Sequence, residues 1–271
     1  YGGNVARWQK YEDVEKSVGD NIGGFTAELL TNSPEVVSVA VQSPTGESQP
    51  LIPARQGSSE EYRFLLEGTT VSISYSLGEF TRERELIFLR FTNPSKGIWR
   101  LRVYPENYVT SRYHIWLPVT EFVQGDIFFL RSNPETPITG PASAYAPISV
   151  GGFNASDDSL YLDSGRGYNI DNQVKPDFLA PAVEVFGPDL TGNFTRRRGG
   201  GGAAAVTAGA AAQLLEWGVV RGNSSDMNNA LIKNYLLVGT DKTPGRVYPN
   251  PEEGYGRLNV YKAFTNMRRT T

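Results

Sequence analysis

Cysteine is absent from the 271 residues, and histidine occurs once, as His114. Without thiols the chain cannot form disulfides, Cys-ligated zinc sites, iron–sulfur clusters or a cysteine nucleophile. A single imidazole cannot build a His-rich metal site, and it offers at most one histidine general base. We therefore expect no metal and no cofactor, and few enzyme chemistries stay open.

An excess of positive charge is also missing. The chain has 26 Lys and Arg against 29 Asp and Glu, a net charge of -3. No global positive field therefore favours nucleic acid or an anionic membrane as a partner. We find no apolar run near the ~18 residues of a membrane-spanning helix, so no membrane span is expected. The chain begins at Tyr1 without a basic segment ahead of an apolar stretch, which suggests a soluble fragment or a processed product.

The first half of the sequence alternates between short apolar runs and turn residues. In one run Trp99, Leu101 and Val103 share one face, and Arg100 and Arg102 share the other, which is the period of a strand with one solvated side. The turns carry Pro and Gly, as tight turns require. The predicted strands are 25–30, 36–41, 62–66, 71–75, 86–91, 98–104 and 113–117. So many antiparallel strands in about 100 residues predict a jelly-roll-like β-sandwich.

The second half has a different pattern. It predicts a short strand at 148–150, an extended segment at 176–181, and helices at 203–217, 226–238 and 258–267. Gly218 would end the first helix, and Ser225 would cap the second. The first helix carries Ala on all sides, which indicates burial all round. Ala208→Leu or Gly209→Leu should then overpack its surroundings.

Several segments of this half resemble, in family order, the motifs of subtilisin-like serine peptidases, the subtilases. Residues 199–209, Gly-Gly-Gly-Gly-Ala-Ala-Ala-Val-Thr-Ala-Gly, resemble the family's serine motif Gly-Thr-Ser-Met-Ala-Ala-Pro-His-Val-Ala-Gly. Four further segments resemble family motifs: Ile-Ser-Val-Gly at 148–151, Ser-Gly-Arg-Gly at 164–167, Lys-Pro-Asp-Phe-Leu-Ala-Pro at 175–181 and Gly-Tyr-Gly-Arg-Leu-Asn at 254–259. The resemblance implies an α/β subtilisin-like fold, represented by the C-terminal part of the peptidase domain.

Three short phrases, at 93–99, 214–217 and 248–250, are similar to clostridial spore-germination subtilases in particular. Those proteins carry an inserted all-β jelly-roll sandwich inside the peptidase domain. The resemblance implies a subtilase segment near the oxyanion loop at 1–19, a jelly-roll insertion at 20–135, and the C-terminal part of the subtilase domain at 136–271. Gly2-Gly-Asn4 is similar to the family's oxyanion loop, so Asn4 is the candidate oxyanion residue.

The nucleophile position of the serine motif holds Gly201. Because glycine has no side chain, no acyl-enzyme can form there. The neighbouring glycines at 199, 200 and 202 also lack hydroxyls, and the nearest hydroxyls, on Thr195 and Thr207, fall outside the motif position. The family's Asp and His motifs precede its oxyanion Asn, which places them before residue 1. We interpret the chain as catalytically inactive as given.

Other polar residues have functional interpretations that we weigh against structural ones. His114 fits a structural histidine in a strand, and Ser164 fits a turn hydroxyl bound to the backbone. The glycines at 199–202, with three arginines before them at 196–198, permit an anion site at a helix N-terminus, but no Gly-Lys-Ser/Thr follows. We favour a degenerate serine loop beside solvated arginines. The acidic pairs at 157–158 and 252–253 fit solvated loops better than calcium ligands.

Three functions follow from these residues. The leading hypothesis is a subtilase-like pseudoprotease in signalling or regulation. The resemblance to germination subtilases implies a role in spore germination in the cortex or coat region. It also implies either a small-molecule germinant or a protein partner, such as a related subtilase or germination protein. The alternative is the C-terminal part of an active serine endopeptidase whose nucleophile is mutated. A third is a carbohydrate-binding sandwich, although we expect most of Trp99, Tyr104 and Trp116 to lie in the core.

Overall fold

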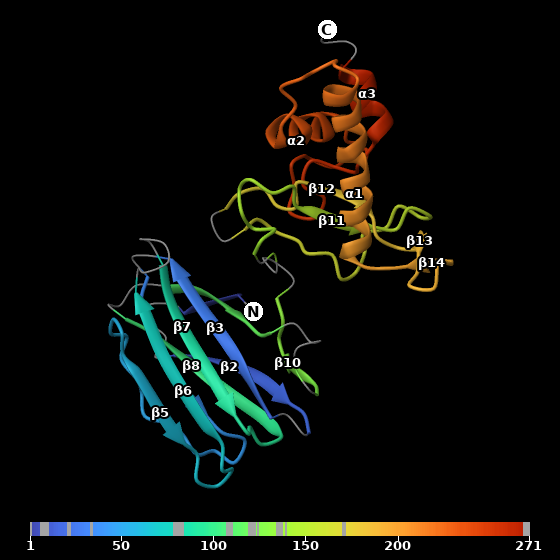
Figure 1. The fold of residues 1–271 in the computed structure, drawn as a ribbon. Helices are drawn as coiled ribbons and strands as arrows, with labels where there is room; N and C mark the ends of the chain where they lie inside the picture. Colours follow the sequence, from blue (N-terminus) through green and yellow to red (C-terminus); the bar gives the residue numbers. More distant parts are fainter. Residues whose placement is uncertain are drawn as a thin grey trace. The chain divides into compact units, whose positions relative to one another are not determined.

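A computed structural model describes residues 2–5, 11–20, 23–32, 35–77, 84–106, 111–118, 123, 125–133, 138, 140–169 and 172–267. The chain divides into two compact units, residues 1–133 and 134–271. Each unit has its own hydrophobic core. Figure 1 shows the strands of the first unit and the helices of the second.

The first unit consists of two antiparallel sheets. Their strand orders are β1-β9-β3-β7-β6-β5 and β10-β2-β8-β4. The strands are β1 (Gly2–Val5), β2 (Glu12–Val18), β3 (Gly24–Asn32), β4 (Val37–Gln42), β5 (Ser59–Arg63), β6 (Thr70–Leu77), β7 (Arg84–Thr92), β8 (Gly97–Pro105), β9 (Ser111–Trp116) and β10 (Ile127–Phe129). The predicted all-β character of this half is therefore confirmed.

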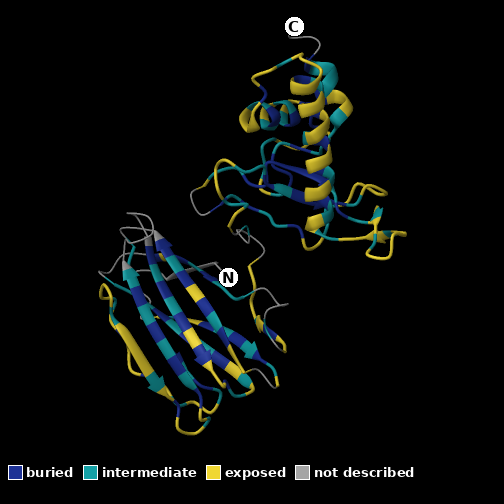
Figure 2. Cartoon of the chain, in the orientation of Figure 1, coloured by how far each residue is buried: buried dark blue, intermediate teal, exposed yellow. Residues whose placement is uncertain are grey.

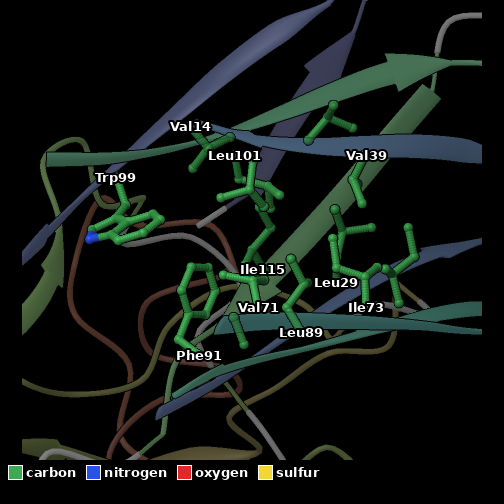
Figure 3. Packing of buried hydrophobic residues seen from close by; sticks show 14 of the residues in the cluster. Val14, Leu29, Val39, Val71, Ile73, Leu89, Phe91, Trp99, Leu101 and Ile115 are labelled. Atoms are coloured by element: carbon green, nitrogen blue, oxygen red, sulfur yellow. The ribbon is translucent and has the colours of Figure 1, made fainter. Parts of the chain in front are cut away.

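Both sheets contribute to one core. In Figure 3, Val14 and Leu101 of the smaller sheet lie opposite Leu29, Leu89 and Phe91 of the larger one. Along β2, β3, β7 and β8 these side chains alternate with half-buried or exposed ones, because neighbouring residues in a strand point to opposite faces. The sheets therefore form a sandwich closed by apolar side chains.

The aromatic residues of the sandwich divide between its core and its outer faces. Trp99 is fully buried, and its ring meets Phe91 edge to face at 5.6 Å. Tyr104 and Trp116 are only half-buried. The prediction that most of this trio lies in the core is therefore wrong. The Tyr104 ring is tilted by 49° to the neighbouring Tyr11 ring, so these two rings are not coplanar.

The first strands of the chain pair within this sandwich. β1 runs antiparallel to β9, with Asn4 opposite Arg112, and β2 runs antiparallel to β8. Both strands lie in the segment 1–19, which the sequence assigned to a subtilase segment. The sequence pattern did not single out β1, β2 or β10, and it placed β5 three residues too late.

The second unit is built around two short parallel strands, β11 (Val150–Phe153) and β12 (Phe178–Pro181). Helix α1 (Gly200–Leu215) packs against both strands. A π-helical turn, η2 (Glu216–Val220), continues from α1, and helices α2 (Asn229–Val238) and α3 (Val260–Met267) pack on each other. β13 (Val185–Pro188) and β14 (Phe194–Arg197) form a separate antiparallel hairpin.

Two helix ends differ from the sequence prediction. Asn228, not Ser225, caps α2, and its side-chain oxygen accepts hydrogen bonds from the N–H groups of Ala230 (3.0 Å) and Leu231 (3.1 Å). Gly218 does not end the first helix, because it lies buried inside η2. The π-helical turn extends the helical run beyond the glycine, so glycine was a misleading stop signal here.

Helix α1 is buried on one side only. Its buried residues are Ala203, Thr207, Ala210 and Leu214, which recur on a single helical face. Figure 2 shows exposed and intermediate residues along much of the helix. Ala208 and Gly209 are exposed, and no atom lies within 4 Å of the Cβ that Gly209 lacks. The prediction of burial on all sides is therefore wrong. Alanine and glycine occur on the exposed face of this helix as well as on the buried one, so their presence did not indicate burial.

The helical run Gly200–Val220 has the length and apolar composition of a membrane span, with a mean hydropathy of 1.3. The expectation that no run of this kind exists is therefore wrong as a statement about composition. Composition of this kind is also common in core helices, and 28% of the most apolar window is buried inside the second unit. The length and composition of this run are therefore only weak evidence for a membrane segment.

Candidate functional site: the degenerate serine loop

The candidate nucleophile position lies in the first turn of α1. The helix begins at Gly200 after Gly199, whose φ of 134° is a conformation that side chains rarely adopt. The N–H of Gly199 donates to Ala182 O (2.8 Å), and the N–H of Gly202 donates back to Gly199 O (3.0 Å). No side chain caps this helix end. These two backbone hydrogen bonds hold the start of the helix in place.

Gly201 itself is exposed, and no atom lies within 4 Å of the position its Cβ would take. Its φ is not among the positive values of the chain. A side chain therefore fits at this position, in contrast to Gly199, where the backbone would be strained. The hydroxyl is missing because residue 201 is a glycine, and not because the loop leaves no space for a side chain.

The motif segments that resemble subtilases meet around β12. Leu179 donates its N–H to Gly256 O (2.8 Å) and accepts from the N–H of Leu258 (2.7 Å). Gly254 has a φ of 56°, and a Cβ there would lie 2.0 Å from Pro176 O. The segment 254–259 therefore needs glycine to lie directly against 175–181. Two segments about 75 residues apart in sequence form one backbone layer.

The strand β11 completes this layer. The N–H of Gly152 donates to Ser164 Oγ (2.9 Å), and Ser164 is 8% exposed. A Cβ on Gly152 would lie 2.5 Å from the Cβ of Ala182. The Ser164 hydroxyl is thus held by the backbone of a strand, which agrees with its structural interpretation. Ala182 has no positive φ, so its backbone conformation does not require glycine.

Neither of the nearest hydroxyls can replace the missing one within this loop. Thr207 is buried and donates its hydroxyl to Ala203 O (2.9 Å), one turn back along α1. Thr195 lies in β14 of the hairpin. Gly199, Gly200, Gly201 and Gly202 carry no side chain. A serine-type nucleophile is therefore absent from the described loop.

The two other candidate residues lie in the first unit. Asn4 lies in β1, and its role in oxyanion binding stays a prediction. His114 lies in β9, opposite Leu30 of β3, and its ring stacks on Trp116 at 5.6 Å. Burial lowers the pKa of His114. A strand position and ring stacking fit the structural interpretation of this histidine.

The charged candidates near the loop are largely solvated or paired. Arg196 pairs with Glu184 at 2.7 Å, and Arg197 and Arg198 are exposed. Asp157 accepts hydrogen bonds from the N–H and hydroxyl of Ser159. Among the residues that the structure describes, no three His, Asp or Glu side chains come together as metal ligands. A helix N-terminus with solvated arginines does not by itself make an anion site.

The acidic pair at 252–253 is bound by basic residues. Arg246 contacts Glu252 at 2.9 Å and Glu253 at 3.0 Å. Glu253 is buried, and the Tyr248 hydroxyl donates a hydrogen bond to it. The arrangement holds the loop before the 254–259 segment, so these carboxylates have a structural use.

Comparison with known proteins shows which family this layer resembles. Residues 124–256, just under half of the chain, match the Peptidase_S8 model, described as the subtilase family. That segment is therefore similar to part of a subtilase domain. A search of the curated proteins finds no match.

Among solved structures, the chain is similar to the CspB protease of Clostridium perfringens, with a TM-score of 0.86 and 28% identity. The match covers 98% of this chain and 56% of the CspB chain, so the present chain spans little more than half of that protein. Two maturation proteases, PagA for prenylagaramide and PatA for patellamide, are 26% identical. The match to PagA covers 46% of this chain and 44% of the PagA chain. The match to PatA covers 48% of this chain and 46% of the PatA chain. Both matches have a TM-score of 0.40.

Proposed function

We propose that this chain is part of a catalytically inactive subtilisin-like pseudoprotease that acts in signalling or regulation. Gly201 at the nucleophile position carries the proposal. The loop is open, the helix begins at the position that the family motif predicts, and the nucleophile's hydroxyl is missing. A protein that keeps the scaffold without the nucleophile retains surfaces and binding but no route to an acyl-enzyme.

The proposal includes the arrangement of the chain. The sandwich of the first unit would be a jelly-roll insertion, residues 20–135, inside a peptidase domain that continues at 136–271. Asn4 would belong to the oxyanion loop of the segment 1–19. The similarity to CspB over 98% of this chain supports an arrangement that both proteins share, since it includes both units.

The biological role proposed is spore germination, in the cortex or coat region. The chain would either sense a small-molecule germinant or control an active sister protease, and a related subtilase or germination protein would be its protein partner. This role rests on the resemblance of the short phrases at 93–99, 214–217 and 248–250 to germination subtilases. Nucleic acid and membrane partners are not part of the proposal.

Labelling with a fluorophosphonate probe tests the loss of catalysis. We expect no labelling of the purified protein and no peptidase turnover, because catalysis without a nucleophile keeps only binding and oxyanion effects, roughly 10³ to 10⁴ over water. Gly201→Ala is the matched control, since it adds one methyl and no hydroxyl. Probe attached at any residue of the unaltered protein would contradict the proposal.

A second candidate function is supported by one observation. The free space at Gly201 would accept a serine side chain, as expected for an active endopeptidase that has lost only its nucleophile. Under this candidate, Gly201→Ser in the complete protein would restore labelling. The pseudoprotease proposal extends the loss of function to the family's Asp and His partners, so under it Gly201→Ser stays unlabelled.

The regulatory role has a separate test in the spore-forming host. Deleting the gene should abolish or delay the germination response, and the unaltered gene or Gly201→Ala should restore it equally. Normal germination of the deletion strain would argue against the germination role, while leaving the inactivity of the loop untouched.

A further inference from the structure

The second unit contains an open-mouthed cavity of about 440 Å³, outside the degenerate serine loop. It lies between residues 145–146, the segment 173–177 that precedes β12, and one face of α2. This volume is within the range of small-molecule sites, about 300 to 1,000 Å³. Three charged residues line it: Lys175, Asp177 and Lys233.

The three charges do not balance. Asp177 Oδ1 lies 2.8 Å from Lys233 Nζ, and Asp177 Oδ2 lies 3.3 Å from Lys175 Nζ. The same carboxylate also accepts the N–H of Ser149 at 2.7 Å. One carboxylate therefore faces two ammonium groups, and the cavity has a surplus of one positive charge.

The other contacts of the two lysines are neutral. Both ammonium groups donate to Pro147 O, Lys175 at 3.2 Å and Lys233 at 3.4 Å. Lys233 also donates to Tyr145 O at 3.4 Å. Carbonyl oxygens solvate an ammonium group but do not neutralise it. The side chain of Lys175 is 3% exposed, so little water offsets the surplus charge there.

The pKa of Lys175 agrees with this geometry. Burial lowers it, Asp177 acts in the opposite direction, and Lys233 lowers it further. A buried cation that its surroundings only partly stabilise gains from an added anion. The remaining lining combines apolar side chains (Ala146, Val174, Ala230, Leu237), two tyrosines (Tyr145, Tyr255) and uncharged amides (Gln173, Asn229, Asn234).

We propose that this cavity binds small monoanionic molecules, with one carboxylate directed at Lys175 and Lys233 and an apolar body against the face of α2. A single carboxylate cancels the surplus charge, whereas a phosphate dianion would reverse it. The inference goes beyond the proposed loss of catalysis and does not depend on it, since ligand titration and probe labelling can fail separately.

Benzoate is the test ligand and benzamide its neutral isostere. Backbone ¹⁵N chemical shifts of the complete 271-residue chain are recorded during titration with each. We expect saturable shifts for benzoate at Lys175, Ala230 and Lys233, and much weaker binding of benzamide. Equal binding of the two compounds, or no saturable shift with benzoate, would overturn the proposal.

Two variants remove the surplus charge from different elements. Lys175→Met leaves Asp177 paired with Lys233, and Lys233→Gln leaves it paired with Lys175. Each should raise the Kd for benzoate roughly tenfold or more, the effect of one charge-assisted contact. Lys242→Met, which removes an exposed lysine of the same unit outside the cavity, should leave the Kd unchanged. If either folded cavity variant binds benzoate as tightly as the unaltered chain, the proposal is wrong.

Discussion

The ammonium group of Lys16 lies 3.9 Å from the centroid of the Phe91 ring inside the sandwich. Lys16 points to the same face of β2 as Val14 and Val18 and is 1% exposed. The Phe25 ring, stacked on Phe91, lies 5.4 Å from the same ammonium group. Aromatic faces attract a cation, but they do not replace its hydration. Burial accordingly lowers the pKa of Lys16 to about 7.

This lysine should make the free energy of unfolding depend on pH above neutrality. The unfolded chain binds the Lys16 proton up to its ordinary pKa of 10.5, whereas the folded chain releases it near 7. Between these values the unfolded state holds more protons, so the free energy of unfolding should rise with pH. Urea unfolding of the first unit, followed at pH 7 and at pH 9.5, measures this rise in the free energy of unfolding.

Lys16→Met should flatten this rise and stabilise the sandwich at neutral pH, on the order of a few kcal/mol, because no charge is then buried. Lys96→Met is the control, since Lys96 is exposed and pairs with Asp20 on the surface. An unchanged pH slope in Lys16→Met would refute the assignment of the effect to this lysine.

Glu85 should produce the opposite slope below neutrality. It is 3% exposed, and burial raises its pKa to about 7, although the N–H of Val37 and the hydroxyl of Thr31 donate to it. Between its ordinary pKa of 4.5 and 7 the folded state holds more protons, so stability should fall as pH rises through this window. Together with Lys16, this gives the sandwich a minimum of stability near pH 7.

Glu85→Gln tests this slope because glutamine keeps a side-chain oxygen for Val37 and Thr31 and cannot ionise. We expect the decline between pH 4.5 and 7 to shrink in this variant, as followed by urea midpoints. Glu61→Gln, an exposed change on β5, should leave the decline as it is. A decline of equal size in Glu85→Gln would show that another group causes it.

The sequence predicted the sandwich strands well where apolar and polar residues alternate. β8 is the clearest case, because Trp99, Leu101 and Val103 face the core as expected. β2 was missed because Lys16 occupies an inward position, where the pattern calls for an apolar residue. No local rule reveals that two phenylalanine rings receive this ammonium group, since they come from β3 and β7.

For the candidate site, the sequence supplied the motif and the missing hydroxyl but not the contacts. The close approach of Gly254 to Pro176 O follows from the fold and could only be suspected from the glycine. The cavity near Lys175 was not predicted, because Lys233 lies 58 residues further on, in α2. The Lys-Pro-Asp sequence at 175–177 was the one available signal.

The two faces of α1 should respond differently to larger side chains. Ala210→Leu, on the buried face, should cost about 1 to 3 kcal/mol through overpacking. Ala208→Leu, on the exposed face, should change stability little, and Gly209→Ala should add up to about 1 kcal/mol through helix propensity. Thermal unfolding of the 271-residue chain measures all three. Equal losses for Ala208→Leu and Ala210→Leu would contradict the one-sided burial of the helix.

Gly199 and Gly201 should separate the structural role of the serine loop from any functional one. Gly199→Ala places a side chain at a φ of 134°, so it should cost about 1 to 3 kcal/mol. Gly201→Ala meets no atom within 4 Å and lies in the first helical turn, so it should be neutral or stabilise by up to about 1 kcal/mol. Urea midpoints compare the two changes.

Germination or partner binding of folded Gly201→Ala should also match the unaltered protein, because the proposed function does not use the loop. If Gly201→Ala abolished that function at an unchanged melting temperature, the loop would be an active site of some kind, and the pseudoprotease proposal would be wrong.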